Sequence, residues 1–212
     1  MYLQQDFKKK SDMHWARKVW HMAGVSLIAV LYILLPEGLA KLGITLAWLS
    51  FVPADYLRQR NPVINEKVVS IFKPIMRQYE LKGFAGTTFL LTGVSVVIFL
   101  FPRSVVIPTL FFLAFADPIA SYFGIRFGKD KIFGQKSLQG TLAAFAVCFL
   151  VMFIFLNYAQ ILTGRMVLVS VIAGVIGALA ELIPIGDVDD NLTLPVISAI
   201  GLFLIFSLFG AL

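Results

Sequence analysis

The chain has 212 residues, of which 59% are hydrophobic and 14% are charged. Soluble domains are about half apolar even when glycine is counted, so this composition excludes a soluble globular protein. The formal net charge is +6, but the basic residues are spread over short segments between apolar runs, which argues against a nucleic-acid-binding face. The single cysteine, Cys148, excludes an intrachain disulfide.

Apolar runs of about 20 residues, the length that crosses a bilayer as a helix, recur along the chain. They predict an all-α polytopic membrane helix bundle that forms one integral membrane domain over residues 1–212. The seven predicted transmembrane helices cover residues 19–36, 42–57, 83–101, 105–125, 142–162, 166–185 and 192–211.

The first two predicted helices carry charged residues at one end. Arg17, Lys18 and His21 fall on one face at the start of the first helix, where cations that reach toward the membrane surface are common. Asp55, near the end of the second helix, can pair with Arg58 one turn further on. These positions alone do not distinguish a functional site from ordinary helix ends.

Residues 61–80, between the second and third predicted helices, show a different pattern. Apolar residues recur there at helical spacing, with charged residues on the opposite side. The pattern predicts an amphipathic helix that lies in the membrane interface and is kinked at Pro74. Its apolar positions are Ile64, Val68, Ile71, Phe72, Ile75 and Tyr79, and its charged positions are Glu66, Lys73 and Arg77.

An aspartate interrupts the fourth predicted transmembrane helix. An ionisable group at membrane depth costs roughly 2.5–3.5 kcal/mol, so Asp117 is expected to have a function, a buried ion pair being the structural alternative. Ser121 lies one turn further on and would share its face. Small residues that allow close approach of a helix or a ligand recur every four positions beside them. These are Ala116, Ala120, Gly124 and Gly128.

The segment that follows is expected to be a loop, and it combines cations, glycines and hydroxyl groups. Glycine lets a phosphate approach the backbone and cations neutralise it, so a phosphate site is expected here, with an ordinary basic loop as the alternative. It is not a Walker A loop, because Asp130 stands where a serine or threonine would hold Mg²⁺. The residues concerned are Arg126, Lys129, Lys131, Lys136, Gly134, Gly140, Ser137 and Thr141.

A cluster of carboxylates and one amide precedes the last predicted helix. Such oxygens bind hard divalent cations, and Mg²⁺ usually takes one or two carboxylates together with substrate phosphates. A solvated acidic turn is the alternative interpretation. The cluster comprises Glu181, Asp187, Asp189, Asp190 and Asn191.

The distribution of basic residues predicts how the bundle is oriented. All of the 18 lysines and arginines belong to one side of the predicted bundle except Lys41, Arg103 and Arg165. Because cytoplasmic loops carry an excess of these residues, the N-terminus and the polar segments are expected in the cytoplasm and the C-terminus on the opposite side.

Several segments, in this order, resemble the dolichol kinase-like family of CTP-dependent lipid kinases, which includes dolichol kinase, phytol kinase and a CTP-dependent diacylglycerol kinase. DPIASYFG at 117–124 and KSLQGT at 136–141 are similar to the family's Asp-x-x-Ala-Ser-x-x-Gly and Lys-Ser/Thr-x-Glu-Gly segments. Ala116 and Gln139 stand where glycine and glutamate are common, so no catalytic carboxylate is expected at position 139. The other matching segments are RKVWHMAG at 17–24, ADYLRQRNP at 54–62, KGFAGTTFLLTG at 82–93 and DNLTLPV at 190–196.

The resemblance implies transfer of a phosphoryl group from CTP to the hydroxyl of a membrane lipid, with Mg²⁺ as cofactor. A polyprenol or dolichol, phytol and diacylglycerol all remain open as acceptor. The implied catalytic residues are Arg17, Lys18 and Asp117, the last as Mg²⁺ ligand or general base. The expected nucleotide-binding residues are Ser121, Gly124, Arg126, Gly128, Lys129, Lys136, Ser137 and Gly140. The expected metal ligands are Asp117, Asp190 and Asn191.

Two other functions remain open at this point. A CTP-dependent lipid cytidylyltransferase has a partly similar Gly-Asp and Lys-Lys pattern, although DNLTLPV resembles the kinases. A transporter or structural membrane protein would place Asp117 along a pore, whereas nearly all charge lies on one side of the predicted bundle.

Overall fold

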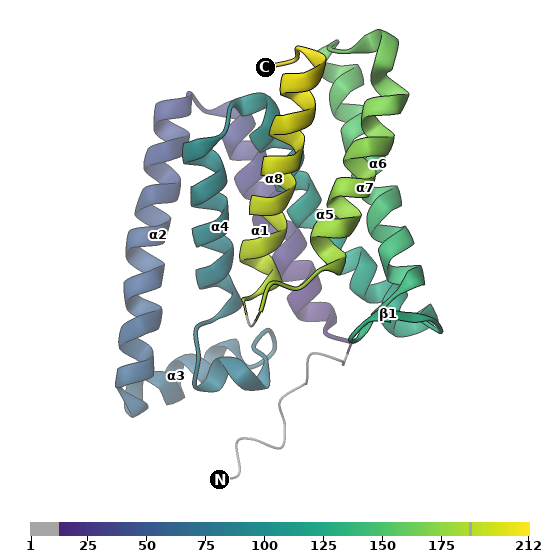
Figure 1. Cartoon of the computed structure of the whole chain (residues 1–212). Helices are drawn as coiled ribbons and strands as arrows, with labels where there is room; N and C mark the ends of the chain where they lie inside the picture. Colours follow the sequence, from purple (N-terminus) through teal and green to yellow (C-terminus); the bar gives the residue numbers. More distant parts are fainter. Residues whose placement is uncertain (1–12, 187) are drawn as a thin grey trace.

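The computed structural model describes residues 13–186 and 188–212, and within them the chain is almost entirely helical (Figure 1). The all-α prediction is therefore confirmed. Lys8, Lys9 and Lys10, which contribute to the predicted orientation, and Asp187 of the acidic cluster lie outside the described residues. The α-helices are α1 (Trp15–Leu34), α2 (Glu37–Arg60), α3 (Pro62–Phe72), α4 (Gly86–Leu100), α5 (Arg103–Phe127), α6 (Leu138–Ala159), α7 (Met166–Leu182) and α8 (Asp190–Phe209). Two 3₁₀ helices, η2 (Gln78–Leu81) and η3 (Thr163–Arg165), and two strands, β1 (Lys131–Phe133) and β2 (Lys136–Ser137), complete the described elements.

Each predicted transmembrane helix corresponds to an observed helix, and α3 lies across one end of the bundle that they form (Figure 1). Among the described residues, five segments are long and apolar enough to cross a membrane: α1, α5, α6, Thr163–Leu182 with α7, and α8. Helix α4 has only 15 residues, about 22 Å at the α-helical rise, and α2 carries charged residues near both ends. The structure thus supports an integral membrane protein, while the number seven stays a prediction.

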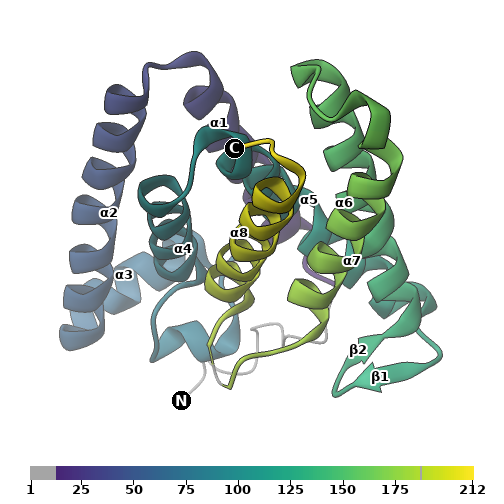
Figure 2. The ribbon, with the colours of Figure 1, turned by 45° about the horizontal axis from the view of Figure 1, so that its top comes forward.

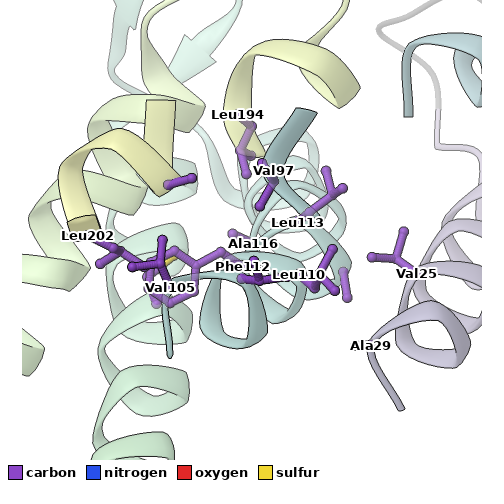
Figure 3. Packing of buried hydrophobic residues seen from close by; sticks show 14 of the residues in the cluster. Val25, Ala29, Val97, Val105, Leu110, Phe112, Leu113, Ala116, Leu194 and Leu202 are labelled. Carbon is purple, nitrogen blue, oxygen red and sulfur yellow. The ribbon is translucent and has the colours of Figure 1, made fainter. Parts of the chain in front are cut away.

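Helix α5 forms the centre of the core. It contacts α1, α4, α6, α7 and α8, and its side chains Leu110, Phe112 and Leu113 are fully buried (Figure 3). Cys148 on α6 is also fully buried, and a Cβ at Gly177 on α7 would lie 2.3 Å from its sulfur. Cys148 is therefore a packing residue at a close helix crossing, as the apolar sequence around it predicts.

Local capping signals determine where the helices at the polar end begin. Ser137 caps α6 by accepting a hydrogen bond from the backbone N–H of Gly140, and Asp189 caps α8 by accepting one from Asn191. Each capping side chain satisfies a backbone donor that would otherwise lack a partner. These caps hold Ser137 and Asp189 at the same end of the bundle as α3.

The segment 61–80 is not one kinked helix as predicted. Helix α3 ends at Phe72, a turn follows, and η2 begins at Gln78. Pro74 accounts for the difference, because a proline lacks the N–H that continues a helix and its ring collides with the preceding turn. Val63 is 64% and Ile71 69% exposed on α3, and the location of this helix in the membrane interface stays a prediction.

The segment after α5, predicted as a loop, contains a short hairpin (Figure 2). Strands β1 and β2 are antiparallel, with Lys131 opposite Ser137 and Phe133 opposite Lys136. The turn contains Gly134 at φ +53°, a conformation that residues with a Cβ rarely adopt. The hairpin returns the chain so that Lys136 and Ser137 lie against the bundle rather than in solvent.

Candidate active site

A cavity of about 320 Å³ lies at the end of the bundle that carries α3 and the hairpin. Its lining comes from the first turns of α1, α6 and α8, the last turns of α5 and α7, the hairpin, and the connection between α3 and α4. Segments distant in sequence therefore converge on one space. Of the predicted site residues, those that line the cavity are Arg17, Lys18, Asp117, Ser121, Gly124, Gly128, Lys136, Ser137, Gly140, Asp190 and Asn191.

Asp117 lines this cavity from α5, and it forms no direct ion pair with any residue that the structure describes. Within residues 13–186 and 188–212, no group donates a hydrogen bond to its carboxylate. The basic side chains closest to it in electrostatic effect are Lys136, Arg77 and Lys18, together with the imidazole of His21. A surrounding set of cations therefore balances its charge, and the carboxylate oxygens stay accessible to a ligand in the cavity.

The side chains of Lys18 and His21 on α1 bind the backbone of α5 beside Asp117. Lys18 Nζ donates to the carbonyl of Pro118 over 2.8 Å, and His21 Nε2 lies 2.8 Å from the carbonyl oxygen of Leu113. Because a carbonyl oxygen only accepts, Nε2 of His21 carries the proton. His21, which the sequence presented as an interfacial polar residue, is thus part of the cavity wall.

Lys136 is the centre of an ion cluster that joins the hairpin to α7 and α8. Its Nζ lies 2.5 Å from Oε1 of Glu181 and 3.4 Å from Oδ2 of Asp190, and it also donates to the backbone carbonyl of Glu181. Burial lowers the pKa of Lys136, but the carboxylates of Glu181, Asp190 and Asp117 outweigh this effect and raise the pKa to about 12. Lys136 is therefore a permanent cation in the cavity.

Arg17 also lines the cavity, but its charge is already paired with that of Glu80. Its Nη1 lies 2.9 Å from both carboxylate oxygens of Glu80 and donates to the carbonyl of Ile75. Glu80 is only 1% exposed and also accepts hydrogen bonds from the backbone N–H groups of Arg77 and Gly86. The pair connects α1 to the segment between α3 and α4.

The glycines near the cavity serve close packing of α5 against the start of α6. A Cβ at Gly128 would lie 2.8 Å from the Cβ of Ser137, the cap of α6, and one at Gly140 would lie 2.8 Å from the carbonyl oxygen of Ala120 on α5. A side chain at either position would force the backbones apart. The small-residue pattern is therefore explained by helix packing, which also brings Ser137 to the cavity.

Two predicted nucleotide-binding residues are not part of the cavity lining. Arg126 is exposed, donates to the hydroxyl of Tyr122 and lies over the ring of Phe127 at 5.6 Å. Lys129 is exposed, and its backbone N–H donates to Oε1 of Gln139. Both belong to the outer surface of the hairpin region.

The sequence did not identify two contributions from the α3–α4 connection. Arg77, expected on the polar face of an interfacial helix, lines the cavity. The hydroxyl of Tyr79 donates to Oδ2 of Asp189 over 2.8 Å, which holds η2 against the start of α8. Pro74 was the available signal, because a helix broken at that residue frees the following segment to fold back under the bundle.

The three predicted metal ligands line the same cavity. Asp190 contacts Lys136, and Nδ2 of Asn191 donates to the carbonyl of Gly86 over 3.3 Å. Within the part of the chain that the structure describes, no group of three or more histidine, cysteine, aspartate or glutamate side chains forms a metal site. The oxygen donors of Asp117, Asp190 and Asn191 are of the type that Mg²⁺ prefers, an ion that also takes substrate phosphates and water as ligands, and their role as metal ligands stays a prediction.

The chain is similar to several lipid kinases. It is 32% identical over 170 residues to "CTP-dependent diacylglycerol kinase 1" of Schizosaccharomyces pombe, which covers 74% of this chain and 78% of the relative. It is 28% identical over 215 residues to the protein of the same name in Eremothecium gossypii, covering 92% and 67%. It is 34% identical over 102 residues to "Farnesol kinase, chloroplastic" of Arabidopsis thaliana, covering 44% and 33%. No family model and no solved structure matches the chain.

Proposed function

The chain belongs to the family of CTP-dependent lipid kinases, and from this premise we propose that it transfers the terminal phosphate of CTP to the hydroxyl of diacylglycerol. Three relatives that align over two thirds or more of this chain are named for diacylglycerol, whereas the farnesol kinase aligns over less than half of it. These names favour a kinase over a cytidylyltransferase. They leave polyprenols and phytol as acceptors to be tested rather than as the first expectation.

The observation that carries the proposed site is the convergence of motif residues in one cavity. Asp117 from one motif and Lys136, Ser137 and Gly140 from the other line it together with Lys18. Phosphoryl transfer depends mainly on positioning and on neutralising the phosphate charge, which this set of groups supplies. We place the phosphates of CTP among Lys18, Lys136 and the backbone around Gly124 and Gly140.

Asp117 has two chemically consistent roles in the transfer. The lipid hydroxyl oxygen attacks the terminal phosphorus, the bond to the departing CDP oxygen breaks, and the hydroxyl proton has to leave. As general base, Asp117 accepts that proton; as metal ligand, it holds Mg²⁺ together with Asp190 and Asn191. Mg²⁺, when bound, neutralises charge on the phosphates.

We further propose that the cavity faces the cytoplasm, where CTP is available, and that α2 and α4 cross the membrane with the other long helices. In support, Lys41, Arg103 and Arg165 all belong to the end of the bundle opposite the cavity. Arg103 donates there to the backbone carbonyl of Tyr32 at the end of α1. The excess of basic residues is thus on the cavity side, as expected for a cytoplasmic face.

Two labelled forms of CTP test the reaction on the purified protein in lipid vesicles. Label at the terminal phosphate should appear in the lipid, with CDP released, and label at the innermost phosphate should not. A panel of diacylglycerol, dolichol, phytol and farnesol should give the highest kcat/KM with diacylglycerol. Transfer of the innermost label would show a cytidylyltransferase instead, and a preference for another alcohol would replace the proposed acceptor.

Asp117→Asn tests the site within the same assay. The amide keeps the shape of the side chain and removes its charge, so the variant should stay folded in detergent and lose activity. Substantial retained activity would reduce Asp117 to a structural residue.

A further inference from the structure

We infer that Arg77 is a phosphate-binding residue of the kinase site, and that Arg17 and Glu80 are positioning residues that hold the segment carrying Arg77 beside the cavity. This inference rests on the proposed function, because it takes CTP as the ligand of the cavity. The guanidinium that contacts the nucleotide is therefore that of Arg77, in the connection between α3 and α4, and not that of Arg17 on α1.

The two arginines of the cavity differ in what already occupies them. Arg17 forms an ion pair, since its Nη1 donates to both carboxylate oxygens of Glu80 and to a backbone carbonyl. The side chain of Arg77, in contrast, makes a single long hydrogen bond within residues 13–186 and 188–212, 3.5 Å from its Nη1 to the hydroxyl of Tyr79. Within the described residues no carboxylate lies at ion-pair distance from Arg77. A half-buried guanidinium with most of its donors unused suits two-point binding of a phosphate.

The charge balance of the cavity leads to the same assignment. Lys136 is compensated by Glu181 and Asp190, and Arg17 is compensated by Glu80, which lies outside the lining. Lys18 and Arg77 are the cations next to Asp117 that lack a carboxylate at ion-pair distance in the described part of the chain. A nucleotide triphosphate brings several negative charges, and these two side chains are placed to neutralise them.

The backbone at Arg77 is fixed on both sides. Its own N–H donates to Oε2 of Glu80 over 2.9 Å, and Glu80 is held by Arg17 of α1. Two residues further on, Tyr79 binds Asp189 at the start of α8. Because α1 and α8 both carry cavity residues, these contacts fix Arg77 relative to the rest of the site. Preorganisation of this kind lowers the entropic cost of binding a ligand.

Arg77→Ala and Arg60→Ala form a matched pair of variants for the test. Both variants remove one positive charge. Arg60 is exposed at the end of α2, lies over the ring of Tyr56 at 4.9 Å and is not part of the cavity lining, so its removal leaves the cavity unchanged. Since a hydrogen bond to a charged group contributes about 1.5–3 kcal/mol, Arg77→Ala should raise the KM for CTP on the order of tenfold or more. The KM of Arg60→Ala should stay within about twofold of the wild-type value.

Arg77→Lys keeps the charge without the planar donor fork, and its KM for CTP should fall between those of Arg77→Ala and the wild type. The KM for the lipid, measured in vesicles of fixed composition, should not change in either Arg77 variant. The melting temperature of Arg77→Ala in detergent should match that of the wild type, since in the described part of the chain this side chain makes one weak hydrogen bond.

The role of Glu80 is tested by combining variants. Glu80→Gln should also raise the KM for CTP, but the double variant with Arg77→Ala should have no higher KM than Arg77→Ala alone, because Glu80 acts on the nucleotide through Arg77. A purely structural role for Glu80 would make the two effects on KM multiply, and that result would overturn the positioning assignment.

The outcomes separate the inference from the proposed function. If the wild type is active and Arg77→Ala has the same KM for CTP as Arg60→Ala, Arg77 does not bind phosphate and the inference is wrong. If the wild type transfers no phosphate to any lipid, the proposed function fails, and equilibrium binding of labelled CTP to the purified proteins then decides on Arg77. Equal CTP affinity of the wild type and Arg77→Ala in that measurement would overturn the inference.

Discussion

The buried ion pair between Asp55 and Arg58 should contribute strongly to stability. The two side chains are 5% and 3% exposed, and both Nε and Nη2 of Arg58 donate to Oδ1 of Asp55, over 2.9 and 2.7 Å. The other carboxylate oxygen accepts hydrogen bonds from the backbone N–H of Ala85 and from the hydroxyl of Thr88. One carboxylate thus connects α2 to the start of α4.

Asp55→Ala would leave the charge of Arg58 buried without its partner. Removing one member of a buried ion pair typically costs about 3–5 kcal/mol. The N–H of Ala85 and the hydroxyl of Thr88 would also lose their acceptor, at about 1–3 kcal/mol each for a group left unsatisfied, although these losses overlap with the first. We therefore expect the free energy of unfolding to fall by about 4 kcal/mol, and by less for Asp55→Asn, which keeps one acceptor oxygen.

Equilibrium unfolding of the purified protein in mixed detergent micelles, followed by circular dichroism, measures this loss. Glu37→Ala is the matched control, because it removes an exposed carboxylate that pairs with Lys41 on the same helix, and it should leave the unfolding free energy unchanged within error. If Asp55→Ala lowers the unfolding free energy by less than about 1 kcal/mol, the reasoning is refuted, since a buried charge without its partner should destabilise the protein by more than that.

Three further predictions concern the polar end and the orientation of the bundle. The pKa of Lys136 is raised from 10.5 to about 12, so its contribution to stability is complete below pH 10.5 and is lost as the pH rises through 12. The difference in melting temperature between the wild type and Lys136→Met should therefore be constant from pH 7 to 9. A difference that becomes smaller over this range would contradict the explanation. Gly86→Ala should lower both the melting temperature and the activity, because a Cβ there would lie 2.4 Å from a guanidinium nitrogen of α1, whereas Gly38→Ala, which meets nothing within 4 Å, should not. A cysteine in place of Lys41 should react with an impermeant thiol reagent added outside intact cells and one in place of Gln135 should not, and the reverse labelling would invert the proposed topology.

The sequence alone was sufficient for features that depend on neighbours along the chain. Apolar runs of bilayer length located every long helix, because a helix in lipid must satisfy its backbone hydrogen bonds within the segment. The pair of Asp55 and Arg58 followed from a spacing of three residues on a helix. The motifs around Asp117 and Lys136 indicated a phosphate site, and both residues line the cavity.

Local patterns were less reliable where the chain turns. The segment 61–80 has helical periodicity throughout, yet the helix ends at Phe72, because the missing N–H and the ring of Pro74 outweigh the periodic pattern. The glycine-rich segment after α5 was expected to be a loop, and the pairing of β1 with β2 became visible only in the structure.

Only the tertiary structure decided which charged side chains share the cavity and which are already occupied. Arg17 and Glu80 are 63 residues apart, and Lys136 and Glu181 are 45 apart, so no local spacing links them. Arg126 lies within the predicted phosphate-binding segment but outside the cavity lining, while Arg77 lies outside the motifs and lines it. The sequence by itself determined the membrane helices and the type of chemistry, because bilayer length and motif identity are local properties. The direction of each side chain depends on how every helix is rotated against its neighbours, and that rotation is set by packing between residues far apart in the chain.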